Sequence, residues 1–368
     1  LYASRAKKAT GEPQPPEAKA DISAGDGPAS GPQNGNGDDT PTRRKDGRSA
    51  DSKGAKPKPP AKPKGPSLLA IQSDRRYVSW IEPSRAAAGR VYLVFDGHRS
   101  DDDRALVFVS EDYGESWKAL HGMLPAAAGT TRVLREDIVN PNVLYLGTEM
   151  GAYVSIDRGA TWTSMNTNLP TVAVHQFAQH ETAGEIVAGT HGRSLWVLDV
   201  TTLRQVTKET LSEAVHLYRP NVAVQWRPEP SRGRTRTFVG VNPPAGATLH
   251  YSLARAVRSA SLEVRRLDGT IVRTLEAPTS AGLHAVSWNL RANPLPRRRF
   301  GARVRPGTYH VVLRVGAKAY ETDVRVDMDP DHRDVSWMAH EDAAEERAAE
   351  KKAAKSIRYA PYDAGRDE

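Results

Sequence analysis

The chain has 368 residues, enough for two ordinary domains, with no cysteine and a formal net charge of +8. The lack of cysteine excludes disulfides, thiolate metal sites and a cysteine nucleophile. The basic residues are scattered, and no segment interleaves arginine with aromatic residues, so the sequence does not indicate a nucleic-acid partner. No apolar run is long enough to span a membrane.

Residues 1–66 have few large apolar side chains and many Pro, Gly, Lys, Asp and Ser residues. Alternating lysine and proline over 56–64 is typical of an extended, polyproline-like tether. Such a segment buries too little apolar surface to offset its conformational entropy. We therefore predict that residues 1–66 form a disordered linker.

Residues 67–220 contain short apolar runs separated by Gly, Asn, Pro and Asp, which is typical of an all-β fold. One run recurs at 90–97, 142–149 and 184–192. The equivalent residues Tyr92, Tyr145 and Val187 lie 53 and 42 residues apart. A repeat of this length with about four short strands predicts one blade of a β-propeller per repeat.

A second motif, Ser-x-Asp-x-Gly-x-Ser/Thr-Trp, follows two of these runs at 110–117 and 155–162, and a third copy keeps only its aspartate. We expect Ser and Asp to bind backbone groups of a tight hairpin, Gly to adopt a conformation that other residues resist, and Trp to anchor the fourth strand. The predicted structural residues are Ser110, Asp112, Gly114, Trp117, Ser155, Asp157, Gly159, Trp162 and Asp199.

Residues 221–330 show a different strand pattern, with a strong hairpin signal at Asp268 and Gly269. Several short strands in this length predict a β-sandwich, to which Trp288 and Tyr309 would add apolar bulk. Residues 331–368 are rich in Ala, Glu, Lys and Arg, and we expect a polar, partly helical tail.

The repeated motif resembles the Asp-box, also called the bacterial neuraminidase repeat. Segments 79–85, 96–102, 168–172 and 189–199 are similar to those of sortilin-type, glycosyl-hydrolase-like propellers of bacteria. The last part resembles the Ig-like module of flagellar hook-capping proteins. This resemblance implies an all-β chain, with three four-stranded blades of an incomplete propeller followed by an Ig-like sandwich.

The resemblance also implies an exported protein, periplasmic, cell-surface or extracellular, whose signal peptide would lie outside this chain. A closed propeller needs four to eight blades. The expected partners are therefore upstream blades, on the same or another chain.

Candidate site residues follow the second strand of each predicted blade, near the expected channel mouth. Asp96, Glu149 and His191 occupy equivalent positions there, as proton-transfer or ligand-binding groups. His98, Arg99 and Arg193 lie beside them as possible ligand-binding residues. The alternative is that these residues repeat only because the turns repeat.

Other polar residues leave alternatives open. The run 101–103 of three aspartates could bind a hard cation or form a solvated loop. The histidines that fall in predicted strands are interpreted as structural; they are His175, His180, His284 and His310. The sequence indicates no cofactor and no metal site.

We therefore expect a non-catalytic binding or scaffolding protein that presents a face to a peptide, glycan or protein. The first alternative is a glycoside hydrolase of sialidase or xyloglucanase type, or its vestige, with two facing carboxylates. A second alternative is a purely structural piece of a large envelope assembly, with apolar surface at the open propeller edges.

Overall fold

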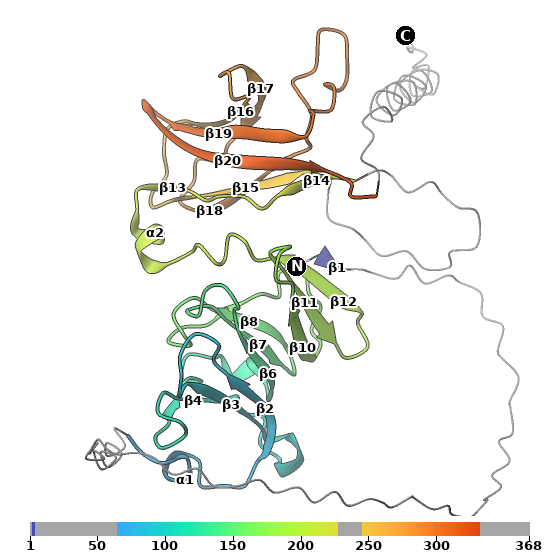
Figure 1. The fold of residues 1–368 in the computed structure, drawn as a ribbon. Helices are drawn as coiled ribbons and strands as arrows, with labels where there is room; N and C mark the ends of the chain where they lie inside the picture. The colour runs from blue at the N-terminus through green and yellow to red at the C-terminus, as the bar shows by residue number, and fades with distance from the viewer. Residues whose placement is uncertain (1, 4–64, 227–244, 332–368) are drawn as a thin grey trace, which may run out of the picture. The chain divides into compact units, whose positions relative to one another are not determined.

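A computed structural model describes residues 2–3, 65–226 and 245–331, and within them the chain is all-β (Figure 1). Residues 4–64 of the predicted linker (1–66) and 332–368 of the predicted tail (331–368) lie outside the described residues. Tyr2 and Ala3, predicted to belong to the disordered linker, instead form a strand. The two described α-helices, α1 (Leu68–Ile71) and α2 (Lys208–Ser212), have four and five residues. No described helix could cross a membrane, which takes about 20 residues.

Three antiparallel sheets of four strands follow one another along the chain. The first orders β2 (Tyr77–Pro83), β3 (Val91–Asp96), β4 (Leu106–Ser110) and β5 (Lys118–Ala119). The second orders β6 (Thr131–Glu136), β7 (Leu144–Thr148), β8 (Gly151–Ser155) and β9 (Thr163–Ser164). The third orders β10 (Val174–Gln179), β11 (Glu185–Thr190), β12 (Leu195–Asp199) and β1 (Tyr2–Ala3).

The fourth strand occupies the same register in each sheet. β5 pairs with Phe108 and Val109 of β4, and β9 pairs with Tyr153 and Val154 of β8. β1 pairs with the equivalent residues Trp196 and Val197 of β12. The third sheet is thus completed by a strand that precedes the other three in the chain.

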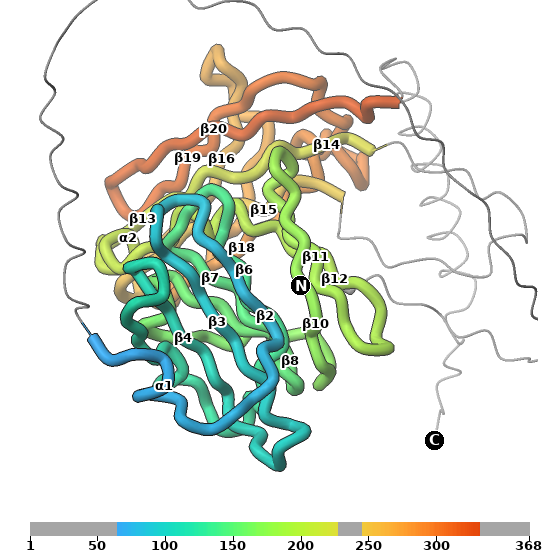
Figure 2. The backbone as a smooth tube through the Cα atoms, turned by 60° about the horizontal axis from the view of Figure 1, so that its bottom comes forward, coloured from blue at the N-terminus to red at the C-terminus, as the bar shows by residue number. Residues whose placement is uncertain are grey.

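The central strands are buried on both faces, which is why they appear in the sequence as continuous apolar runs. All five residues of β4, β7 and β8 are buried. One apolar core lies between the first and second sheets, with Val94 and Leu146 fully buried. A second lies between the second and third sheets around Tyr145 and Phe177. Figure 2 shows the backbone of these sheets from a second direction.

The two turns predicted from the repeated Ser-Asp-Gly-Trp motif share one hydrogen-bond pattern. The Ser110 hydroxyl donates to Asp112 (2.9 Å) and accepts from the Gly114 amide (2.8 Å). Asp112 also accepts from the Ser116 amide and hydroxyl, at 2.8 and 2.6 Å, and these bonds lower its pKa. The Asp157 turn repeats all four bonds at 2.7–2.9 Å.

The tryptophans of these turns are half-buried. Trp117 Nε1 donates to the Gly114 carbonyl of its own turn (2.9 Å). Trp162 Nε1 instead donates to the Leu120 carbonyl (2.9 Å), and its ring packs on the core between the first two sheets. Trp162 therefore ties the second sheet to the first.

The predicted third-copy aspartate, Asp199, lies one position before the place of Asp112 and Asp157, because Leu198 takes the register of Ser110 and Ser155. Asp199 accepts from the Thr201 amide (2.8 Å).

Helix α1 covers part of the outer face of the first sheet. Leu68 and Ile71 pack against a small core that contains Phe95 and Phe108. The chain is held there by the Trp117 amide, which donates to the Pro66 carbonyl (2.9 Å).

Two further sheets form the C-terminal part of the described chain. One orders β13 (Val215–Leu217), β15 (Ala247–Leu253) and β18 (Gly282–Trp288). The other orders β14 (Ala223–Gln225), β20 (Lys318–Met328), β19 (Gly307–Val315), β16 (Ala260–Arg265) and β17 (Ile271–Glu276). Because β13 pairs with β15, residues 215–217 group with these sheets, ahead of the predicted start at 221.

One core joins these two sheets. Trp288 is fully buried in it, and its ring meets that of Tyr309 edge-on at 5.6 Å. The predicted hairpin at Asp268 and Gly269 joins β16 to β17, and Gly269 has a φ of 84°, a conformation that favours glycine.

We expect replacement of both Leu68 and Ile71 by alanine to lower the free energy of unfolding by about 1–3 kcal/mol, because each half-buried side chain loses apolar contact with the first sheet. Leu69 of the same helix is 77% exposed and provides the matched control. Urea unfolding measures the difference. Equal losses for the double variant and Leu69→Ala would contradict the packing of α1.

We expect Trp162→Ala to cost about 2–4 kcal/mol, because it removes apolar area and the hydrogen bond to Leu120 together. Trp226 is 58% exposed, so Trp226→Ala should change stability by less than about 0.5 kcal/mol. Thermal and urea unfolding of the two variants provide the comparison. A Trp162 variant as stable as the parent would show that this ring does not clamp the sheets.

Candidate functional site

A register shift recurs in the first strand of each of the three N-terminal sheets. The pairing skips one residue between Val78 and Trp80 in β2, as a β-bulge does. It skips one residue at the equivalent place in β6 and in β10. The skipped residues are Ser79, Arg132 and His175. Since a bulge changes the direction of a side chain relative to its strand, these three residues leave the normal alternation of the sheet.

The residues predicted from the repeat lie at the nearby end of the second strand. Asp96 is the last residue of β3, Glu149 follows β7 directly, and His191 follows β11 directly. Each sheet therefore brings one skipped residue and one strand-end residue to the same end, and five of these six residues carry polar groups that can ionise.

Arg132 joins the carboxylates of Asp96 and Glu149. Its Nη1 donates to Asp96 Oδ2, while Nε and Nη2 donate to Glu149 Oε2 at 2.9 and 2.5 Å. Asp96 is buried, and its Oδ1 also accepts from the Thr130 hydroxyl (3.0 Å) and the His98 amide (2.8 Å). Both Asp96 oxygens are therefore occupied by hydrogen bonds. The Glu149 side chain, in contrast, is 36% exposed.

The two histidines lie next to this ion-pair cluster. The rings of His175 and His191 are 5.3 Å apart, centre to centre. Among the described residues, neither ring has a hydrogen-bond partner, so their nitrogens are available to a ligand. Burial, followed by the positive charges of Arg132 and His191, lowers the pKa of His175. A lowered pKa favours the neutral imidazole, which has one acceptor nitrogen.

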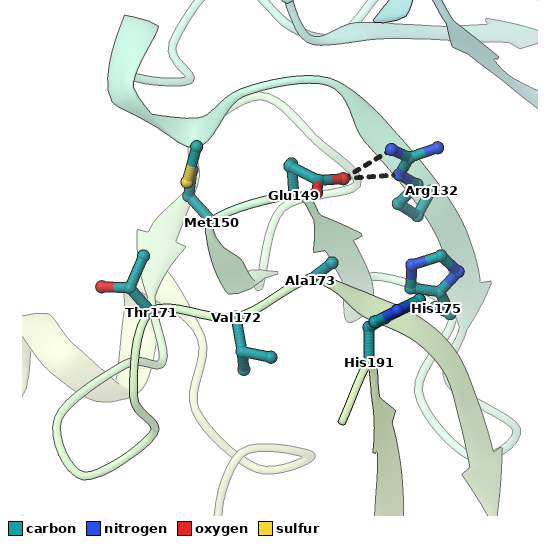
Figure 3. Close-up of a pocket in the computed structure, with 8 residues that line it drawn as sticks. All are labelled: Arg132, Glu149, Met150, Thr171, Val172, Ala173, His175 and His191. Carbon is teal, nitrogen blue, oxygen red and sulfur yellow. Dashed lines mark hydrogen bonds and ion pairs between the residues drawn. The ribbon is translucent and has the colours of Figure 1, made fainter. Parts of the chain in front are cut away.

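These side chains line a cavity of about 370 Å³ (Figure 3). The polar lining comes from Arg132, Glu149, Thr171, His175 and His191, and the apolar lining from Met150, Val172 and Ala173. In Figure 3, Glu149 points toward Arg132, and His175 lies below the guanidinium. The backbone closes one wall, where the His191 amide donates to the Ala173 carbonyl (2.9 Å).

The other predicted ligand-binding residues do not line this cavity. His98 is exposed, and its Nδ1 lies 3.4 Å from Asp103. Arg99 and Arg193 are also exposed and outside the lining. The structure therefore brings Glu149 and His191 together, with Asp96 behind Arg132.

In the aspartate run at 101–103, the middle residue is bound by two arginines. Asp102 accepts from Arg104 Nε (2.7 Å) and Arg76 Nε (3.1 Å). The bonds from Arg104, and then that from Arg76, hold the pKa of Asp102 well below its usual range. No group of three or more His, Asp or Glu residues in the described ranges could hold a metal ion.

Sequence reasoning missed Arg132 and interpreted His175 as structural, although both line the cavity. A signal exists when the first strands are aligned on the repeat, because Ser79, Arg132 and His175 then fall in one column. The polar residues in that column indicate the position of the candidate site.

No family model matches the chain, and no curated protein matches it in sequence. Comparison with solved structures finds weak similarity to two β-propeller proteins. A GH74 xyloglucanase from Xanthomonas campestris is 14% identical, with a TM-score of 0.28. The match covers 67% of this chain and 36% of the xyloglucanase, so this chain spans about a third of that protein. YCF48 bound to D1 peptide is 11% identical, with a TM-score of 0.22 and coverage of 70% and 68%.

We expect Arg132→Leu to lower the free energy of unfolding by about 2–4 kcal/mol, because it leaves the buried Asp96 carboxylate without a compensating charge. Adding Asp96→Asn should recover part of that loss. Arg193→Leu, at an exposed residue outside the cavity, provides the control. Urea unfolding of the parent, the Arg132→Leu and Asp96→Asn single variants and their double variant gives the coupling energy. Additive effects of Arg132→Leu and Asp96→Asn would contradict the pairing.

Proposed function

We propose that the three N-terminal sheets are consecutive blades of an Asp-box propeller and that the C-terminal sheets are an Ig-like sandwich. Equal registers of the fourth strands and identical bonding of the Ser110 and Ser155 turns support the repeat. One core joining a three-stranded and a five-stranded sheet supports the sandwich. The family resemblance is the basis for proposing that the protein is exported.

We further propose that the propeller part is a non-catalytic binding module. One observation carries this proposal: Arg132 binds both candidate carboxylates, Asp96 and Glu149. Most glycoside hydrolases use two carboxyl groups that face each other across the substrate, one of them a proton donor. Asp96 instead lies behind the guanidinium with both oxygens bonded, so Glu149 is the one candidate carboxylate that lines the cavity.

A second part of the proposal concerns the partner of the first sheet. Val78 and Ile81 of β2 pair with Phe95 and Leu93, and so share the face that α1 covers farther out. They are 40% and 58% exposed. An exposed apolar strip beside a covered one fits a blade that packs on β2, whether it belongs to the same or another chain.

The binding proposal is tested by assaying the full chain on xyloglucan and on sialylated oligosaccharides, with Glu149→Gln and Asp96→Asn as matched variants. We expect no turnover above background in the parent. Turnover that falls about a thousandfold or more in either variant would establish a hydrolase and overturn the proposal.

A further inference from the structure

We propose that the cavity at Glu149 binds a cationic side chain, the ammonium of a lysine or the guanidinium of an arginine on a peptide, and releases it in acid. This inference rests on the proposed binding function and specifies its ligand. Three properties of the cavity carry it: its charge, its free hydrogen-bonding groups and its size.

The fixed charges leave a net negative site. Asp96 and Glu149 contribute two negative charges and Arg132 one positive charge, so these three groups together carry one negative charge. Both donors that Arg132 turns toward Glu149 bind Oε2, so Oε1 remains free on a side chain that is 36% exposed. A cation is the charge that this oxygen attracts.

The cavity offers three free acceptors. Glu149 Oε1 and one nitrogen each of neutral His175 and His191 can accept hydrogen bonds. An ammonium has three N–H donors and no acceptor, and a guanidinium has five. These donors match a carboxylate oxygen and two imidazole nitrogens, whereas an anionic ligand would meet the Glu149 carboxylate.

The walls and the volume fit a side chain. Val172, Ala173 and Met150 supply an apolar lining, against which the methylene stem of lysine or arginine can pack. The cavity of about 370 Å³ lies at the small end of ligand pockets. It would hold one long side chain more readily than an oligosaccharide chain.

Acidification should weaken binding. The charged groups that act on His175 are Arg132, His191, Glu149 and Asp96. Protonation of His175 removes an acceptor nitrogen and adds a positive charge beside the bound cation. Because the pKa of His175 is lowered, this loss occurs below the normal histidine range as the pH falls.

The test uses the full chain and four acetylated, amidated pentapeptides that differ only at the central residue: Lys, Arg, norleucine or Glu. Binding is measured by calorimetry, and the His175 and His191 ring signals are followed by NMR. At about pH 7.5 we expect the Lys and Arg peptides to bind at least about tenfold more tightly than the norleucine and Glu peptides. Lowering the pH to about 5 should weaken Lys-peptide binding about tenfold or more.

Glu149→Gln should reduce Lys-peptide binding at least about tenfold, whereas Glu115→Gln, at an exposed residue outside the cavity, should not. Circular dichroism checks that both variants fold. Equal binding of the Lys and norleucine peptides, no binding of either by the folded chain, or pH-independent binding would overturn the inference. A neutral oligosaccharide that shifts the two histidine signals while the Lys peptide does not would also overturn it, but would leave the binding function standing.

Discussion

A one-residue register shift in the first strand of each N-terminal sheet is the constraint on which the candidate site depends. In a regular strand, Arg132 and His175 would follow the alternation of their neighbours between the two packed faces of the sheet. Skipping one residue in the pairing with β7 and β11 takes both side chains out of that alternation. They can then reach the groups that end the second strands, Glu149 and His191.

The packed cores turn this local irregularity into a defined site. β7, which leads directly to Glu149, is buried along its whole length, so the strand end has little freedom to move. Arg132 then links the first sheet to the second through Asp96 and Glu149. The side chain that organises the cavity therefore also holds adjacent sheets together.

The first and the third sheet are covered by different elements. The outer face of the first sheet is apolar, and α1 covers its β3 and β4 part but leaves Val78 and Ile81 exposed. The third sheet lacks the hairpin that supplies β5 and β9 in the others, and β1 takes the equivalent register on β12. β1 pairs with an edge that could otherwise pair with another strand, whereas α1 covers apolar surface on a sheet face.

The sequence by itself determined the strands, the repeat and the turn chemistry, because these depend on residues close together in the chain. The apolar runs at Tyr92 and Tyr145, the hairpin at Gly269 and the equivalence of Asp96, Glu149 and His191 could all be predicted from local patterns. Only the tertiary structure decided that Arg132 separates Asp96 from Glu149, that His175 joins the cavity and that α1 covers the first sheet. Each of these depends on strand register and on packing between residues far apart in the chain, which local periodicity does not encode.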